Sequence, residues 1–224
     1  MNYAISDIHG CFDEFMEMLE KIKFSEKDTL YVLGDVFDRG PEPIKTLKYI
    51  MKHKNIKMLL GNHEAMMMDA LEIGLKSDKE LWLQNGGFST LADLHDLKEE
   101  EIKEILTFLH SLPLYFIVNN MLLVHAGINS FKVDPKKTLE ENLKKQTAED
   151  LLWVRRNFIV WPTGLKNKVI FGHTPISIMR TGKAFIWFDE KDEDKIGIDC
   201  GLVFGGKLGC LNLDNMEEYY VDKH

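Results

Sequence analysis

Two acidic residues follow a predicted buried strand in a loop bounded by glycines, and this loop constrains the chain more than any other stretch. The apolar run Leu30–Leu33 leads directly into Gly34-Asp35-Val36-Phe37-Asp38-Arg39-Gly40. Gly-Asp ends the strand and Arg-Gly-Pro begins the next element, so both carboxylates lie on a tight loop at a strand's end. Two carboxylates three residues apart, with a cation beside them, make a poor structural turn and suit a reaction centre. Loops after strands are also where open α/β sheets bind ligands.

Four further strand ends carry side chains of the same kind, namely Asp7 and His9, Asn62 and His63, His125, and His173. Each alone has an ordinary structural explanation. Imidazole nitrogen mixed with carboxylate and carboxamide oxygen suits Mn²⁺, Fe or Zn²⁺ better than Ca²⁺ or Mg²⁺ alone. The set is too large for one ion with open positions and large enough for two ions that share a carboxylate, which can clamp both oxygens of a phosphoryl displacement. The sequence therefore predicts a binuclear metallohydrolase. Four histidines lack this context and are expected to be structural: His53, His95, His110 and His224.

Composition limits the other classes of protein. At 224 residues and 45% hydrophobic content, the chain fits one catalytic domain covering residues 1–224. A formal charge of −8 argues against nucleic acid and against a polybasic membrane surface. No apolar run approaches the roughly 20 residues of a spanning helix, and no cleavable signal is visible, so we expect a cytoplasmic location. The three cysteines are expected to be buried and reduced, because no arginine lies six residues after any of them, as cysteine-dependent phosphatases require.

Hydrophobic spacing predicts alternating strands and helices. Strands are expected at 2–6, 30–33, 56–60, 114–118, 121–124 and 169–171, and antiparallel strands at 185–188, 196–198 and 207–213. Helices are expected at about 12–23, after Pro41, at about 65–75, within 82–112 except at Asn85-Gly86-Gly87, and from about 135 to 157. The stretch 189–195 is predicted to be a solvated charged turn, and Met66–Met68 to fill the core.

The five loops together resemble the metal-dependent phosphoprotein phosphatases, a family of metallophosphoesterases. The matching signatures, in order, are Asp7-x-His9-Gly10, Gly34-Asp35-x-x-Asp38-Arg39-Gly40, Gly61-Asn62-His63-Glu64, His125-Ala126-Gly127 and Gly172-His173-Thr174-Pro175. The resemblance spans nearly the whole chain. The stretch after Gly61, with Trp82-Leu83-Gln84-Asn85-Gly86-Gly87, looks most like the small bacterial and bacteriophage-lambda branch. That branch includes serine/threonine phosphatases and hydrolases of dinucleoside tetraphosphates.

The resemblance implies a calcineurin-like α/β sandwich of two mixed sheets flanked by helices, with two divalent ions at the strand ends. We expect these ions to be Mn²⁺, with Fe or Zn²⁺ as the alternatives. One ion would take Asp7, His9 and Asp35, and the second Asp35, Asn62, His125 and His173. His63, oriented by Asp38, would protonate the leaving alkoxide while a hydroxide between the ions attacks phosphorus. Arg39, Arg155 and Asn62 would hold phosphate oxygens. Arg156 is the neighbour that could be mistaken for Arg155. A histidine beside a carboxylate is suited to this role, and arginine suits a phosphate dianion.

Two departures from the family pattern leave the substrate class open. Leu60 stands where many eukaryotic and viral members carry arginine, and leucine is common there among tetraphosphatases. Glu64 stands where the tetraphosphatases typically carry aspartate, which points the other way.

The sequence favours hydrolysis of phosphomonoesters, with phosphoserine or phosphothreonine in proteins as the substrate and no regulatory subunit. The first alternative is symmetrical cleavage of diadenosine tetraphosphate. An alternative of another class is a metal-binding regulator without catalysis, which would be expected to lose His63, Asp38 or a ligand, and none is missing.

Overall fold

Two five-stranded mixed sheets form the centre of the computed structural model, which describes residues 1–179 and 184–224. The first sheet has the order β10-β9-β1-β2-β3, and its strands are β1 (Asn2–Ile5), β2 (Thr29–Val32), β3 (Ile56–Met58), β9 (Lys207–Asn212) and β10 (Glu218–Asp222). Within it β1, β2 and β3 are parallel, and β9 and β10 are antiparallel additions. The three parallel strands therefore end at one edge of the sheet.

The second sheet has the order β4-β5-β6-β8-β7. Its strands are β4 (Tyr115–Val118), β5 (Met121–Val124), β6 (Val169–Phe171), β7 (Trp187–Phe188) and β8 (Lys195–Gly197). The predicted hairpin of β4 and β5 is present. The antiparallel strands expected at 185–188 and 196–198 are present as β7 and β8, and β8 in addition runs parallel to β6. The parallel trio β5, β6 and β8 gives this sheet, too, an edge where strands end together.

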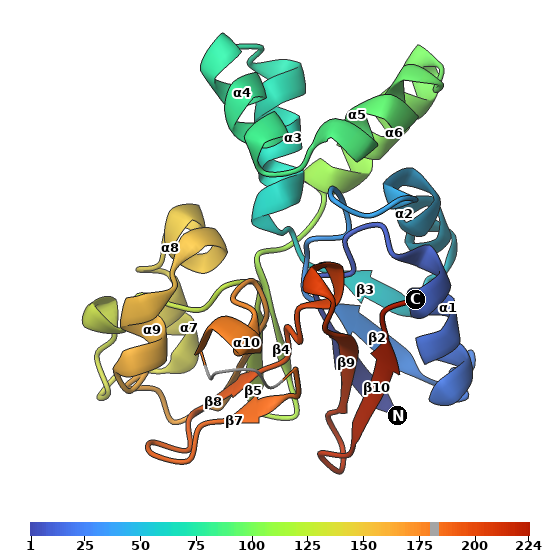
Figure 1. Cartoon of the computed structure of the whole chain (residues 1–224). Coiled ribbons are helices and arrows are strands. Elements are labelled where there is room, and N and C mark those ends of the chain that lie inside the picture. The colour runs from blue at the N-terminus through green and yellow to red at the C-terminus, as the bar shows by residue number, and fades with distance from the viewer. Residues whose placement is uncertain (180–183) are drawn as a thin grey trace.

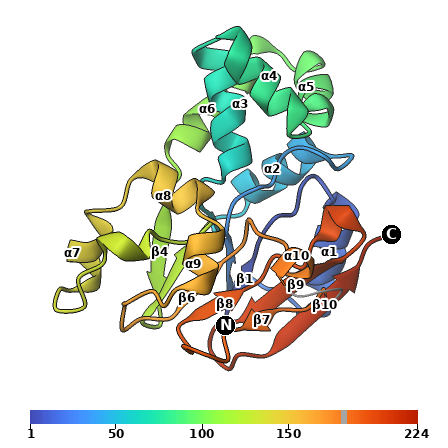
Figure 2. The same cartoon turned by 60° about the vertical axis from the view of Figure 1, so that its left-hand side comes forward.

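Successive side chains of a strand point to opposite faces of its sheet, and the core therefore has three layers. One layer lies between the sheets, and one lies on the outer face of each sheet. In β5, Leu123 packs between the sheets with Ala4, Leu33 and Ile170, whereas Leu122 faces away from them. This alternation follows from the two-residue period of a strand. Because both faces of these strands are covered, nearly every residue in them is apolar, as in parallel sheets generally. The predicted sandwich of two mixed sheets flanked by helices is confirmed (Figures 1 and 2).

Helices cover the outer face of each sheet. The first sheet carries α1 (Phe12–Lys21) and α2 (Pro43–Lys52), and the second carries α7 (Leu139–Leu143), α8 (Ala148–Trp153) and α9 (Arg156–Val160). The single helical stretch predicted from 135 to 157 is thus three short helices. Thr138 and Thr147 each accept a hydrogen bond from the backbone N–H three residues later, so each begins a new helix. The remaining short elements are η1 (Ser130–Lys132), α10 (Ile176–Met179) and η2 (Leu202–Phe204).

Four further helices rise above the sheets as a helical projection (Figure 1). They are α3 (Asn62–Glu72), α4 (Lys76–Gln84), α5 (Phe88–His95) and α6 (Glu99–His110), and the predicted break at Asn85–Gly87 separates α4 from α5. Met66, Met67 and Met68 are buried at the base of this projection, as expected. Among the described residues, no helix is both long and apolar enough to cross a bilayer.

The charged stretch 189–195 is not a fully solvated turn. Lys195 begins β8 and is 1% exposed, and its Nζ lies 3.0 Å from Oδ2 of Asp189 and 2.6 Å from Oδ1 of Asp194. The two carboxylates offset the cost of burying the ammonium group. This charged stretch therefore contains a buried ion-pair cluster at the start of β8.

Replacing Lys195 by alanine should lower the free energy of unfolding by about 3 kcal/mol, because it leaves two carboxylates facing each other without their cation. Lys195→Met should cost less, since it keeps the packing of the aliphatic chain. Lys191→Ala is the matched control, because Lys191 is 75% exposed and its pair with Asp192 is at the surface. Urea unfolding measures all three, and equal values for Lys195→Ala and Lys191→Ala would contradict the structure.

Candidate metal and phosphate site

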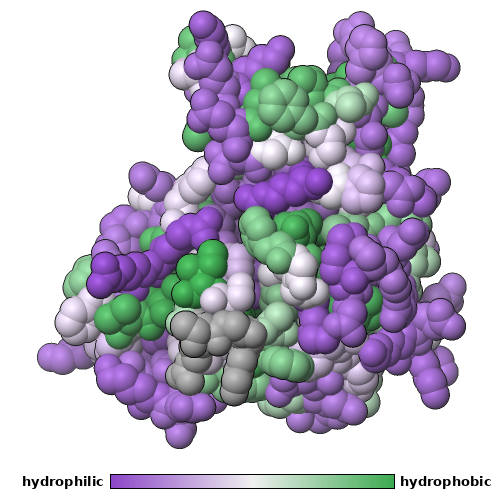
Figure 3. All heavy atoms as spheres, in the orientation of Figure 1, coloured by the Kyte–Doolittle hydropathy of each residue, from purple (hydrophilic) through white to green (hydrophobic). Residues whose placement is uncertain are grey.

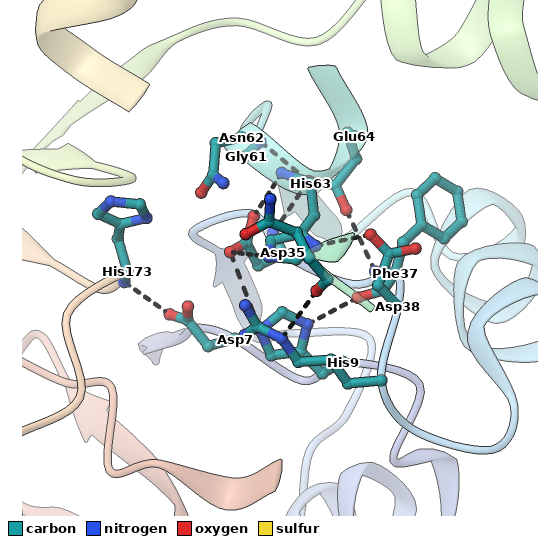
Figure 4. A network of polar contacts seen from close by, with 12 residues as sticks. Asp7, His9, Asp35, Phe37, Asp38, Gly61, Asn62, His63, Glu64 and His173 are labelled. Atoms are coloured by element: carbon teal, nitrogen blue, oxygen red, sulfur yellow. Dashed lines mark hydrogen bonds and ion pairs between the residues drawn. The ribbon is translucent and has the colours of Figure 1, made fainter. Parts of the chain in front are cut away.

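The predicted ligand side chains converge at the edge where the strands of both sheets end. Asp7 and His9 follow β1, Asp35 and Asp38 follow β2, Asn62 and His63 open α3 after β3, His125 follows β5, and His173 follows β6. All are buried, although they come from positions up to 166 residues apart, as for the bond from the N–H of His173 to Oδ2 of Asp7. Figure 4 shows the group around Asp35. Parallel pairing brings them together because it aligns the carboxyl ends of neighbouring strands.

Close backbone approach at this edge requires glycine. A Cβ on Gly34 would lie 2.6 Å from Cα of Gly61 and 2.9 Å from Nδ1 of His125. A Cβ on Gly61 would lie 2.3 Å from Oδ1 of Asp35. The glycines of these two signatures therefore let two loops and a histidine ring meet around one carboxylate.

Three acceptor atoms and Nδ1 of His173 face one another around the second predicted metal position. Nδ1 of His125 lies 2.7 Å from the carbonyl of Leu33 and must donate there, so Nε2 carries the lone pair. That Nε2 lies 2.8 Å from Oδ1 of Asn62, 3.1 Å from Nδ1 of His173 and 3.4 Å from Oδ1 of Asp35. The lone pairs of His125 Nε2, Asn62 Oδ1 and Asp35 Oδ1 repel at these separations unless a cation lies among them. The donor set therefore fits a divalent ion bound by nitrogen and oxygen.

The first predicted position has the same chemistry at His9. Its Nδ1 lies 2.6 Å from the carbonyl of Phe37, which again leaves the lone pair on Nε2, 3.9 Å from Oδ2 of Asp35. Nη1 of Arg39 donates to this Nε2 at 2.6 Å. The guanidinium therefore uses the lone pair by which His9 would bind an ion. The side chains form two groups of possible ligands, and within each group the ligand atoms lie no more than 4.8 Å apart. The first group is His9, Asp35 and His63, and the second is Asp35, His125 and His173. Asp35 belongs to both groups, as a bridging ligand would.

Two predicted residues are placed differently from the ligand set implied by the family. Nε2 of His63 lies 3.9 Å from Oδ2 of Asp35, which puts His63 in the first group. Asp7 is not a member of either group among the described residues, and its Oδ2 accepts from the N–H of His173 at 2.9 Å. Asp7 still lines the same cavity. The choice of Asp7 as a ligand and His63 as an acid remains a prediction.

Burial governs the charges of these groups. Desolvation lowers the pKa of His9 and, more mildly, that of His125, so both rings are neutral and able to bind a metal. Desolvation raises the pKa of Asp35, and the negative charges of Asp7 and Glu64 act in the same direction. A cation at this point would relieve the cost of burying these carboxylates together.

His63 and Asp38 form a buried hydrogen-bonded pair beside the predicted metal positions. Nδ1 of His63 lies 2.6 Å from Oδ2 of Asp38, and both side chains are buried. Burial raises the pKa of Asp38 to about 6, while hydrogen bonds from Thr90 and Trp82 lower it. Burial lowers the pKa of His63 to about 2, and the charges of Arg39, His125 and Arg155 act in the same direction. At neutral pH Asp38 is thus the acceptor, and the shared proton is on Nδ1 of His63.

Both predicted arginines line one cavity, Arg39 from the loop after β2 and Arg155 from the turn between α8 and α9. The cavity has a volume of about 250 Å³ and is lined by both arginines together with Asp35, His63 and His173. Nη1 of Arg155 donates to the carbonyl of His173 at 2.8 Å, whereas Arg156 is not among the lining residues and begins α9. The apolar side chains Ile178 and Phe204 line the mouth and are 74% and 63% exposed. Figure 3 shows apolar and strongly polar side chains meeting on this face.

Sequence reasoning missed how Glu64 is used. Its Oε2 accepts from the N–H groups of Gly61 and Asp35, each at 2.9 Å, and its Oε1 accepts from Val36 at 2.8 Å and Phe37 at 3.3 Å. Burial raises the pKa of Glu64 to about 7. The hydrogen bonds from the backbone N–H groups lower the pKa, but burial has the larger effect. The side chain fastens the loop after β2 to the first turn of α3 (Figure 4). Its position three residues after Gly61 is the sequence signal for such a cap.

The comparisons with known proteins agree with this geometry. Residues 3–206 match the family described as calcineurin-like phosphoesterase, and the chain belongs to that family of metal-dependent phosphoester hydrolases. The match to the symmetrical bis(5'-nucleosyl)-tetraphosphatase of Hamiltonella defensa is 36% identical over 57% of this chain. It covers only 44% of that relative, so the chain spans less than half its length.

Other relatives match along almost the whole chain. Serine/threonine-protein phosphatase 1 of Salmonella typhimurium is 30% identical, with 92% of this chain and 88% of the relative covered. The asymmetrical bis(5'-nucleosyl)-tetraphosphatase PrpE of Bacillus velezensis is 28% identical, with 97% and 91% covered. Among solved structures, a protein serine/threonine phosphatase from Saccharomyces cerevisiae superposes with a TM-score of 0.64 at 18% identity, covering all of this chain and 80% of that one. This last likeness supports the fold alone.

Replacing Glu64 by glutamine should lower the free energy of unfolding by about 2–3 kcal/mol, because an amide cannot accept from all four N–H groups. Glu72→Gln is the matched control, since Glu72 lies at the other end of α3 and its bond to His110 is exposed. That control should change stability by less than about 0.5 kcal/mol. Urea unfolding of metal-free protein gives both values, and a neutral Glu64→Gln would show that the loop does not depend on this side chain.

Metal titration should find two Mn²⁺ ions for each chain. Removing His125 by His125→Ala should abolish one site and leave the other, because His125 belongs to one ligand group only. Asp35→Asn should weaken both sites, since its carboxylate is shared between the groups. Calorimetric titration of dialysed protein counts the sites, and a single ion in the unaltered chain would contradict the two-site arrangement.

Proposed function

We propose that this chain is a metal-dependent phosphomonoesterase whose substrates are phosphoserine and phosphothreonine in proteins. The observation that carries the proposal is the meeting, in one cavity, of a carboxylate shared by two ligand groups, the His63–Asp38 pair and two arginines. Metal positions, a proton donor and phosphate-binding cations are the parts that hydrolysis of a phosphate ester requires.

Substrate binding is the task of Arg39 and Arg155. Both are exposed, and both lie on the wall of the cavity that contains Asp35. A phosphate dianion between them would take charge-assisted hydrogen bonds from each guanidinium. Arg39 would then exchange its bond to Nε2 of His9 for one to a phosphate oxygen. In that position Arg39 would leave the lone pair on Nε2 of His9 free to hold a metal ion.

Proton transfer is the task of His63. Asp38 holds the proton on Nδ1, so Nε2 is the atom that faces the cavity and can pass a proton to the leaving oxygen. Arg39 and Arg155 oppose a positive charge on His63, and an entering phosphate would neutralise them and add negative charge of its own. Substrate binding therefore favours the protonated form of His63 in which it can act as an acid.

Two divalent ions, when bound, would supply Lewis-acid charge on the phosphate oxygens and lower the pKa of attacking water. Asp35, His9, His125, His173 and Asn62 are the residues that would hold them, with Asp7 at the edge of the group. Mn²⁺ is the proposed metal, because mixed imidazole, amide and carboxylate donors suit it.

Two observations support a phosphorylated protein side chain over a larger substrate. The cavity of about 250 Å³ is below the roughly 300–1,000 Å³ of pockets that enclose whole small molecules. The similarity to serine/threonine-protein phosphatase 1 extends over 92% of this chain at 30% identity. An open, small site can admit a phosphate on a side chain while the rest of the protein substrate stays outside.

Hydrolysis of dinucleoside polyphosphates is the second candidate function. The near full-length similarity to PrpE favours it, as does the exposed ring of Phe204 at the mouth of the cavity. The Arg39 guanidinium lies 5.3 Å from the centre of this ring, so a base stacked on Phe204 would sit beside a phosphate held by Arg39. The same metal positions and proton donor would serve this reaction.

The deciding measurement compares kcat/KM on a phosphoserine peptide with kcat/KM on diadenosine tetraphosphate, both with Mn²⁺ supplied. We expect the peptide to be preferred at least tenfold, about 1.4 kcal/mol of transition-state binding. Excess chelator should abolish both activities, and added Mn²⁺ should restore them. A tenfold preference for the nucleotide would replace the first function by the second, and undiminished turnover in chelator, or none with metal, would overturn both.

A further inference from the structure

The motif Trp82-Leu83-Gln84-Asn85-Gly86-Gly87 lies at the turn between α4 and α5, outside the strand-end loops, yet it contacts Asp38 and Arg39. Nε1 of Trp82, at the end of α4, donates to both carboxylate oxygens of Asp38 at 3.0 Å. The backbone N–H of Arg39 donates to the carbonyl of Gly86 at 3.0 Å, and Nε of Arg39 donates to the carbonyl of Asn85 at 3.3 Å. The turn between α4 and α5 therefore contacts both Asp38 and Arg39.

Thr90, in the first turn of α5, completes the surroundings of Asp38. Its Oγ1 donates to Oδ1 of Asp38 at 2.6 Å and accepts from the backbone N–H of Asp38 at 2.9 Å. Trp82, Thr90 and Asp38 are all fully buried, so water cannot take over these bonds. Asp38 also has φ of +69° and Arg39 has φ of +68°, a conformation that non-glycine residues adopt only when their surroundings hold them there.

The directions of these hydrogen bonds determine where the proton of His63 lies. The indole N–H of Trp82 can only donate, and the single hydroxyl hydrogen of Thr90 points to Oδ1. Both groups therefore require Asp38 to be an acceptor, which leaves Oδ2 to accept from Nδ1 of His63. With Nδ1 protonated, Nε2 of His63 is the nitrogen left for exchange with the substrate.

We infer that Trp82 and Thr90 are positioning residues that act through Asp38, fixing the tautomer and orientation of His63 for proton donation to the leaving group. This inference rests on the proposed phosphatase function and adds to it the reason for the α4–α5 turn. The helical projection thus supplies the support of the proton donor, while the strand ends supply the metal ligands. Gly86 permits the contact, since a Cβ there would lie 2.7 Å from Cγ of Arg39.

The test exploits the dependence of a general acid on the leaving group. Thr90→Val removes the hydroxyl with little change of shape and should lower kcat on phenyl phosphate about tenfold, part of the roughly 10²–10⁴-fold that a general acid contributes. On p-nitrophenyl phosphate, whose leaving group needs little protonation, the loss should be under about threefold, with KM nearly unchanged on both. Thr90→Ser keeps the hydroxyl and should restore the activity on phenyl phosphate.

Two further variants guard the interpretation. Trp82→Phe keeps the aromatic packing but removes the N–H, so it should show the same dependence on the leaving group even if Thr90→Val does not fold. Ser89→Ala is the matched control, because Oγ of the neighbouring Ser89 has no hydrogen-bond partner among the described residues. It should behave like the unaltered chain. Equal losses of Thr90→Val on both aryl phosphates, or the same loss in Ser89→Ala, would overturn the inference.

A second readout is independent of catalysis. In metal-free protein the Nδ1–H of His63, bonded to Asp38 at 2.6 Å, should give a downfield proton resonance that is absent in His63→Asn. Thr90→Val and Trp82→Phe should shift or broaden it, and Ser89→Ala should not. If the unaltered chain hydrolyses no phosphoester with metal, the proposed function fails, and this resonance still decides whether Trp82 and Thr90 position His63. A resonance unchanged in both variants would show that they do not.

Discussion

The parallel pairing of β1 with β2 and of β2 with β3 is the constraint on which the site depends. It brings the ends of three strands, and the loops that follow them, to one edge of a sheet. The parallel pair of β5 and β6 does the same for His125 and His173 from the other sheet. A slip of one residue in any of these pairings would turn the ligand-bearing loop and exchange the two faces of the strand. Register therefore couples the packing of the core to the geometry of the metal positions.

The core between the sheets holds strained backbone at its edge. Asp7, His9, Asp35, Asp38, Arg39 and His173 all have φ between +48° and +69°. Each such conformation costs free energy for a residue with a side chain and persists where the surroundings over-determine it. Glu64 and Gly34 are part of those surroundings, the first by hydrogen bonds and the second by allowing close approach. These strained residues lie in the loops after β1, β2 and β6, which carry the site side chains.

Local signals predicted elements well where hydrophobic spacing and capping agree. The strands around 3, 31, 57, 122 and 170 and the helices after Cys11 and Pro41 lie where the pattern put them. The pattern was silent where the partner decides the outcome. β8 pairs antiparallel with β7, as expected, but also parallel with β6. The residues of β10 are mostly exposed or half-buried and give no strong alternation that would predict its pairing with β9. Lys195 looked solvated by composition, and only the nearby carboxylates of Asp189 and Asp194 make its burial possible.

The sequence by itself determined the chemical identity of the site, because ligand-type residues recur directly after apolar runs and the family signatures span nearly the whole chain. The resemblance carried by those signatures also predicted the sandwich of two mixed sheets. Only the tertiary structure decided which atoms meet: that Arg39 lies on Nε2 of His9, that Arg155 and not Arg156 reaches the cavity, and that Trp82 and Thr90 hold Asp38. Hydrogen bonds between residues 44 and 52 positions apart leave no periodic trace in a sequence, because they depend on how separate elements pack. Hydrophobic patterns indicate which apolar residues are buried, whereas the hydrogen-bond partners of a residue are known only from the fold.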